Sequence, residues 1–318
     1  MNLKTILQII GTVFALISSF LGALYWLGGD LILSGFLCAA LVTALYFIVD
    51  QLVRRKVEVR KQRFGPVSLV LWAGYALVSL PLSLLLLHGL NVEIFHRSEV
   101  QTAAALKIAA LDGMAKAYNA QVADELDSLQ TVLRPPLETY AANKAETAAE
   151  GTLMQRPFQL SPASLASLAP SDVAQFVGLW LSTKQAVFDK AQVAATDRAK
   201  AYRKGNEQVF TDWHRLKVPL AYAELDTLVT TNLRELKASF AAHTATSRAT
   251  FYYDLPQVPM LMAEPLALWR RTTPYALLLA VAAFHALLLL PFLLEKGAGT
   301  YLHASGSVQE RFPEAFEL

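Results

Sequence analysis

The stretch VSLVLWAGYALVSLPLSLLLLHGL, which occupies Val67–Leu90, decides the fold, and it contains no Lys, Arg, Asp or Glu. An α-helix rises about 1.5 Å per residue, so a helical run of this length can cross the roughly 30 Å hydrocarbon core of a bilayer. Three further runs have the same character, namely Ile6–Leu27, Leu31–Val49 and Tyr275–Leu294. We therefore predict four transmembrane helices.

The overall composition agrees with these runs. The chain has 318 residues, 54% of them hydrophobic, and its mean hydropathy is +0.35. The first run follows Lys4, as in a signal peptide, but Gly28–Asp30 leads straight into a second apolar run instead of a cleavage site. We therefore interpret the first run as a retained helix.

Charge next to the runs predicts their orientation. The loop 50–66 between the second and third runs is rich in basic residues, and short basic loops stay in the cytoplasm. Both termini are then cytoplasmic and residues 91–273 lie outside, which is the periplasm in a bacterium with two membranes. Arg270 and Arg271 argue for the opposite orientation, although long translocated domains largely escape the charge rule. The basic residues of the loop are Arg54, Arg55, Lys56, Arg60, Lys61 and Arg63.

The organisation that follows has four parts. Residues 1–90 contain the first three spans with their basic loop, and residues 91–273 form a domain outside the membrane. Residues 274–294 form the fourth span, and residues 295–318 form a short cytoplasmic tail. The protein is thus expected in the bacterial inner membrane as a multi-pass protein, in contact with membrane lipids, whose anionic headgroups the basic loop attracts.

The domain at 91–273 is rich in alanine and poor in glycine, a composition that favours helix. Apolar residues recur in it at steps of three and four, which predicts three or four amphipathic helices packed as a bundle or hairpin. Pro135-Pro136 is predicted to end the first of them, and Pro219 to begin or kink a later one. The apolar stripes are Leu111, Met114, Tyr118, Val122, Leu126, Leu129 and Val132 or Leu133; Val173, Phe176, Val177, Trp180, Leu181, Val187 and Phe188; and Leu225, Leu228, Val229, Leu233, Leu236 and Phe240.

Sequence signatures of common chemistries are missing. Cys38 is the only cysteine, and the chain has no His-Glu-x-x-His, no phosphate-binding glycine loop and no Gly-x-Ser-x-Gly. We therefore predict no catalytic, cofactor-binding or metal-ligating residues, and a protein that is not an enzyme. A net charge of +2 does not favour a nucleic-acid partner.

Three polar positions in or beside the runs are of interest. His285 lies near the middle of the fourth run, where it serves either helix packing, with one hydrogen bond to a neighbouring helix, or a proton or ligand role. His88 is expected at the outer interface. Asp50 stands four residues before Arg54, so the two are expected to pair on one helix face.

A stripe of small residues runs along one face of the first run. Small residues at this spacing let helices approach closely in lipid, so we predict a helix-packing surface. Its partner is either another span of the same chain or another subunit. The stripe consists of Gly11, Ala15, Ser18 and Gly22.

The layout resembles a family of uncharacterised bacterial four-span membrane proteins with a long helical insert between spans three and four. The residues that carry the resemblance are FIVD at Phe47–Asp50 and LNVEIF at Leu90–Phe95. It implies the same topology and carries no assigned activity or catalytic residues.

Two functional hypotheses follow. The first is a non-enzymatic scaffold or sensor subunit of a bacterial envelope complex, whose helical domain binds a partner protein or another copy of the chain. The alternative is a transporter or channel component. No acidic residue lies deep in any run, which makes an ion pathway difficult to build and disfavours the alternative.

Overall fold

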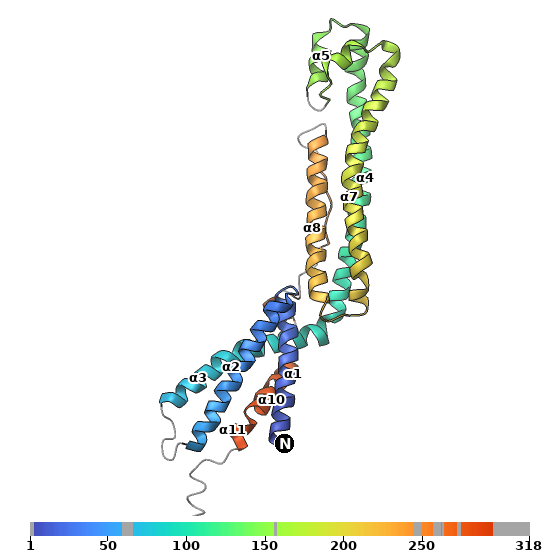
Figure 1. Ribbon diagram of the computed structural model, residues 1–318. Coiled ribbons are helices and arrows are strands. Elements are labelled where there is room, and N and C mark those ends of the chain that lie inside the picture. The colour runs from blue at the N-terminus through green and yellow to red at the C-terminus, as the bar shows by residue number, and fades with distance from the viewer. Residues whose placement is uncertain are drawn as a thin grey trace, which may run out of the picture. The chain divides into compact units, whose positions relative to one another are not determined.

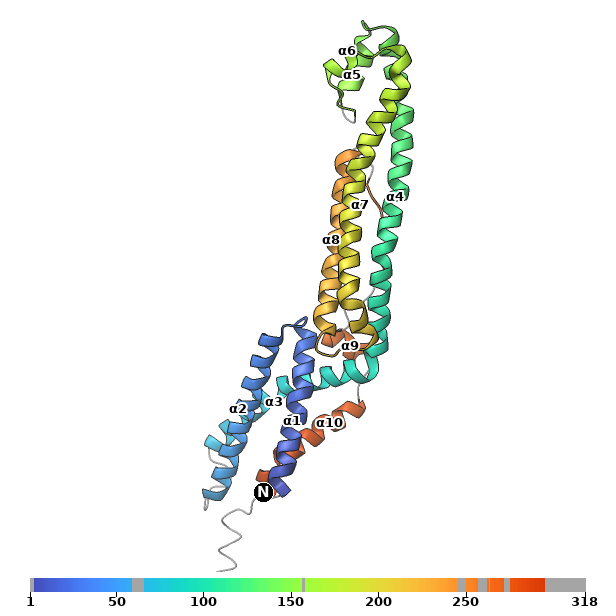
Figure 2. The same cartoon turned by 45° about the vertical axis from the view of Figure 1, so that its right-hand side comes forward.

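Every regular element of the described part of the chain is a helix, so the predicted all-α class is confirmed. The chain divides into two compact units. The first comprises Met1–Val100, His214–Leu220 and Met260–Leu318, and the second comprises Gln101–Trp213 and Ala221–Pro259. The computed structural model (Figures 1 and 2) describes residues 3–58, 66–155, 158–244, 250–256, 262, 264–271 and 275–294.

Three helices of the first unit are long and apolar enough to cross a membrane. They are α1 (Leu3–Trp26), α2 (Leu31–Glu58) and α3 (Pro66–Asn91), and they match the first three predicted spans. α2 extends through Arg54–Lys56, so part of the predicted basic loop is helical. A five-residue π-helix, η1 (Val92–His96), follows α3 directly.

The fourth apolar run forms two shorter helices, α10 (Tyr275–Leu288) and α11 (Leu290–Leu294). Pro291 explains the local break, because it has no N–H to donate to the carbonyl of Leu287. The helical ladder is kept on both sides, since Leu289 N donates to His285 O at 2.9 Å and Leu293 N donates to Leu289 O at 2.8 Å. A short helix, α9 (Pro265–Arg271), precedes α10.

The first unit has an apolar exterior and a core in which leucines pack together with small and polar residues. Ile32 is 86% exposed, Leu77 77% and Leu279 73%, whereas Ser19 and Ser34 are fully buried. A protein surface in water rarely carries apolar area on this scale. These exposed faces are suited to lipid, and the interior is suited to close contact between helices.

Two glycines set the closest approach between α1 and α3. A methyl group added at Gly22 would overlap the backbone carbonyl of Leu85, and one added at Gly89 would overlap the carbonyl of Ser18. Ser19 adds a hydrogen bond across the same crossing, from its hydroxyl to Leu82 O at 3.2 Å. Backbone therefore packs on backbone here, which only glycine allows.

The second unit consists mainly of α4 (Arg97–Ala142), α7 (Val173–Thr211) and α8 (Val218–His243), which lie side by side in Figures 1 and 2. The sequence predicts three or four amphipathic helices, and the three apolar stripes lie on α4, α7 and α8; α8 begins next to Pro219 as expected. Shorter elements join α4 to α7: α5 (Thr147–Met154), α6 (Pro162–Ala166) and the 3-10 turn η2 (Pro170–Asp172).

The core of the second unit centres on aromatic rings. Tyr118 of α4 contacts three rings edge-on, with centroid distances of 6.4 Å to Phe188, 6.1 Å to Phe240 and 5.3 Å to Phe251. Ion pairs tie the helices outside this core, including Lys107 to Asp226 at 2.6 Å. Of the two alternatives at the end of the first stripe, Leu133 is fully buried and Val132 is 53% exposed; Val187 of the second stripe is also exposed.

The prediction that Pro135-Pro136 ends the first helix is wrong, because α4 continues through both prolines to Ala142. The two missing N–H groups cost backbone hydrogen bonds, but the residues beyond the prolines are held by packing. Leu137 is fully buried and Tyr140 is 5% exposed, in a core that also includes residues of α5, α6 and α7. Tertiary burial thus outweighs the local preference of proline.

Candidate functional site

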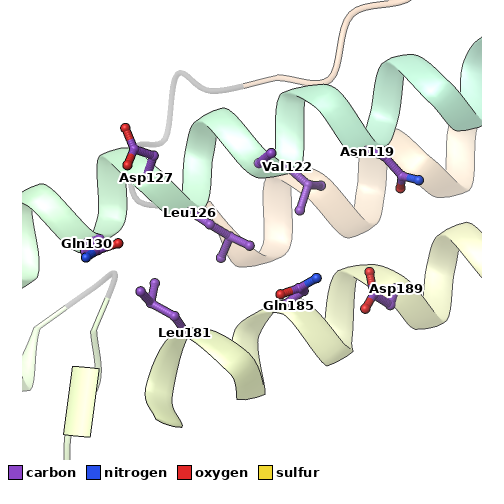
Figure 3. A pocket seen from close by; sticks show the side chains of 9 residues that line it. Asn119, Val122, Leu126, Asp127, Gln130, Leu181, Gln185 and Asp189 are labelled. Carbon is purple, nitrogen blue, oxygen red and sulfur yellow. The ribbon is translucent and has the colours of Figure 1, made fainter. Parts of the chain in front are cut away.

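A groove of about 490 Å³ lies between α4 and α7 in the second unit, and Figure 3 shows it from close by. Its volume is within the range of ordinary ligand and peptide sites. The two helices that form its walls are antiparallel, because Gln101 near the start of α4 bonds the backbone of Phe210 near the end of α7. The residues that line the groove are Asn119, Val122, Ala123, Leu126, Asp127, Gln130, Leu181, Gln185 and Asp189.

The two ends of the groove differ in chemistry. Leu126 and Leu181 point toward each other from opposite walls near the end that also carries Asp127 and Gln130, and at the other end Asn119 and Asp189 face each other (Figure 3). Gln185 lies between these two ends, on the α7 wall. Leu126 and Leu181 are each only partly buried. The groove thus offers an accessible apolar contact beside polar groups.

The charge of the groove is negative. Asp127 and Asp189 form no ion pair with any residue in the described ranges, and no lysine or arginine lines the groove. Two cations stand next to lining residues in the sequence of α7, namely Lys184 before Gln185 and Lys190 after Asp189. The ammonium of Lys184 lies 5.2 Å from the ring centroid of Trp180, and partial burial lowers its pKa.

These lining groups are able to bind a ligand. Amides, carboxylates and leucines bind through shape, hydrogen bonds and charge, and all three kinds line the groove. Within the part of the chain that the structure describes, no three His, Cys, Asp or Glu side chains gather as a metal site.

A second polar region lies in the first unit, where α3 passes into η1. His88 was expected at the outer membrane interface; its side chain is 1% exposed and its Nε2 donates to Met262 O at 2.8 Å, so it is buried within the protein. Asn91 is fully buried, and neither its amide atoms nor Nδ1 of His88 has a hydrogen-bond partner among the described residues. Buried unpaired polar groups are costly, and π-helices are rare and often occur at functional positions.

The same region anchors the turn between α7 and α8. The hydroxyl of Tyr25 donates to the Glu93 carboxylate, whose second oxygen lies 3.0 Å from Nε of Arg215. Gly29 has a positive φ of 93° and lies directly against the backbone of Leu220. The turn His214–Leu220 is therefore bound to the α1–α2 turn and to η1 within the first unit. Sequence reasoning missed this polar region, although its polar residues follow directly on the apolar run of α3.

His285 is engaged on both ring nitrogens. Nδ1 lies 2.7 Å from the hydroxyl of Tyr75, and Nε2 lies 2.8 Å from the hydroxyl of Ser83, both on α3. One hydrogen bond to a neighbouring helix was expected for the packing role, and two are present. The geometry thus favours the packing interpretation of His285 over a proton or ligand role.

The small-residue stripe of α1 faces other helices of the same chain. Gly11 lies against Leu287 of α10, and Gly22 lies against α3. Ala15 is 1% exposed and Ser18 is 5% exposed. Of the two partners considered for the stripe, the observed one is within the chain.

The described residues of the basic loop are bound to neighbouring groups or exposed. The predicted pair between Asp50 and Arg54 is confirmed at 2.8 Å, and Arg55 is exposed. The ammonium of Lys56 donates to Phe292 O at 2.5 Å and lies 4.6 Å from the centre of that ring. Arg60, Lys61 and Arg63 fall outside the described residues.

Comparison with protein-family models, curated proteins and solved structures gives no match to this chain. The resemblance of its layout to a family of four-span proteins therefore stays a prediction. The geometry of the chain itself is therefore the basis for a proposed function.

Proposed function

We propose that the protein is a non-enzymatic scaffold or sensor subunit of a bacterial envelope complex, anchored by four spans, and that its second unit binds a partner protein. The observation that carries this proposal is the groove between α4 and α7. Its apolar contact, Leu126 with Leu181, remains accessible, and its two carboxylates, Asp127 and Asp189, are not neutralised by the described part of the chain.

Packing within the first unit supports the fourth span. Residues 275–294 are about 30 Å long as helix, enough for a bilayer core. His285 contacts Tyr75 and Ser83, while the later residue Phe292 contacts the earlier Trp72 at 5.4 Å between ring centroids. α10 and α11 therefore lie antiparallel to α3, as consecutive crossings in opposite directions require.

A sensor role is supported by helical continuity. The backbone is helical without a gap from Pro66 to Ala142, so a span leads directly into a helix of the second unit. The only irregular turn along this path is η1 (Val92–His96), next to the unpaired polar groups of His88 and Asn91. π-helical turns are rare and frequently occur at functional sites, which supports a role for η1 in a sensor.

The partner-binding proposal is tested on the full chain reconstituted in its native membrane lipids. We expect native mass spectrometry to find a stoichiometric second polypeptide or a second copy, and we expect Leu181→Arg to remove it, because the new cation is placed at the apolar contact of the groove. Val193→Arg is the matched control, since Val193 is 50% exposed on the same helix and does not line the groove. A strictly monomeric protein, or equal loss in both variants, would contradict the proposal.

Topology is tested separately with single cysteines. Cys38 is replaced by alanine, and a cysteine is placed at the exposed Ser171 or at Ser307 of the predicted tail. A membrane-impermeant maleimide added to spheroplasts should label position 171 at once and position 307 only after lysis. Immediate labelling of the tail would reverse the proposed orientation.

A further inference from the structure

We infer that the groove receives a basic amphipathic helical segment of the partner protein. This inference rests on the proposed function, because it names the chemistry of the partner that the second unit would bind. Three properties of the groove support it, namely its length, its apolar lining residues and its charge.

The length of the groove fits a short helix. Its α4 wall runs from Asn119 to Gln130, which corresponds to about 16 Å at 1.5 Å per residue. That is three turns of a helix lying along the seam between α4 and α7. Leu126 and Leu181, next to the buried Val122, then form an apolar contact surface for one large aliphatic or aromatic side chain of the occupant.

The negative charge of the groove determines which charged residues the bound helix should carry beside its apolar stripe. Asp127 lines the groove on α4, and α4 carries no lysine or arginine from Tyr118 to Leu133. Asp189 adds a second carboxylate from α7, and it faces into the groove (Figure 3). An occupant with lysine or arginine beside its apolar stripe would pair with these two groups, whereas an acidic occupant would be repelled.

The groove cannot easily be neutralised from its own wall. Lys184 stands between Leu181 and Gln185 in sequence order, but its ammonium lies over Trp180. Asp127 and Asp189 form no ion pair with a described residue, and a cationic occupant would therefore meet two carboxylates.

The experiment measures binding of three synthetic peptides of about 14 residues to the full chain in nanodiscs of phosphatidylcholine. That lipid has no net charge, so basic peptides are not drawn to the membrane itself, and empty nanodiscs give the background. The first peptide has leucine on one helical face and lysine on the other. The second replaces every lysine by glutamate, and the third has the composition of the first in an order without a stripe.

We expect the basic striped peptide to bind, with an affinity that falls as salt is raised, and we expect at least tenfold weaker binding of the other two. The double variant Asp127→Asn, Asp189→Asn should weaken binding of the basic peptide by about three- to tenfold, as expected for two partly exposed charge pairs. The matched control is Asp197→Asn with Glu207→Gln, which removes two exposed carboxylates of α7 outside the groove and should leave binding unchanged.

Failure of this inference is distinguishable from failure of the proposed function. If the native complex is lost with Leu181→Arg but is unaffected by the double asparagine variant, the second unit binds a partner. The occupant of the groove is then not a basic helix, and the inference is overturned. If the acidic peptide binds as well as the basic one, or the control pair weakens binding equally, the inference is also overturned. A second copy of this chain as the occupant would appear as a dimer in the native mass and would equally contradict it.

Discussion

The two units of this chain are both built from helices, but they place their side chains in opposite ways. In the first unit large aliphatic residues such as Ile32 lie on the surface, and glycine and serine form the closest contacts inside. In the second unit aromatic rings around Tyr118 fill the interior, and most exposed positions carry alanine, uncharged polar or charged residues. The contrast follows from the surroundings that each unit suits, because burying apolar area is favourable in water but gains little in lipid.

The largest effect is expected in the aromatic core of the second unit. Phe188 is fully buried among Tyr118, Phe240 and His243, so Phe188→Ala should cost about 3–5 kcal/mol through lost burial and a cavity. Hydrogen exchange of the full chain should show faster exchange throughout α4, α7 and α8. The neighbouring Val187 is 37% exposed, so Val187→Ala is the control and should change stability by less than about 1 kcal/mol. Equal effects would contradict the assigned core.

Replacing a glycine by alanine should lower stability in the first unit and raise it in the second. Gly22→Ala adds a methyl group that overlaps the carbonyl of Leu85, so we expect a loss of about 2–3 kcal/mol as α1 and α3 are pushed apart. Gly178→Ala meets no atom within 4 Å on α7, and it should stabilise by about 0.5–1 kcal/mol through helix propensity. Thermal unfolding in detergent measures both. Stabilisation by Gly22→Ala would show that the close crossing is absent.

The contribution of an ion pair to the stability of the fold should increase with its burial. Arg215 pairs at 3.0 Å with Glu93, whose side chain is 11% exposed, and Arg215→Met should cost about 1–2 kcal/mol because the carboxylate stays partly buried. Arg134 pairs at 2.7 Å with Glu138 on the exposed surface of α4, and Arg134→Met should cost only about 0.3–0.5 kcal/mol. Limited proteolysis near residues 214–220 reports the first change. No difference between the two variants would remove the proposed anchoring of that turn.

The smallest expected effect is a pH dependence from His243 in the second unit. Burial and, less strongly, the nearby Lys184 charge lower the pKa of His243 below its usual 6.5, so the folded state binds its proton less readily than the unfolded state. The stabilisation is then complete above pH 6.5 and declines as the pH falls below that value. The stability of the wild type relative to His243→Gln should therefore be lower at pH 5 than at pH 7.5. A wild type that gains stability relative to the variant on acidification would contradict this sign.

Only the larger apolar residues of the candidate groove could be anticipated, and its polar residues and its function could not. The apolar stripes predicted that Leu126 and Leu181 lie on the inner faces of two helices, and both do line one groove. The stripes could not reveal that these two leucines stay accessible, because that depends on the separation of the helices. His88 shows the same limit, since an end-of-span histidine was expected at an interface and its burial depends on Met262, far along the chain.

The sequence by itself determined the helical class, the apolar runs and the three long helices of the second unit, because hydrophobic periodicity and length act locally. Only the tertiary structure decided that α4 passes through Pro135-Pro136, that Gly22 meets Gly89, and that η1 forms next to buried polar groups. Each of these depends on partners distant in sequence, whose packing outweighs local preference by a few kcal/mol.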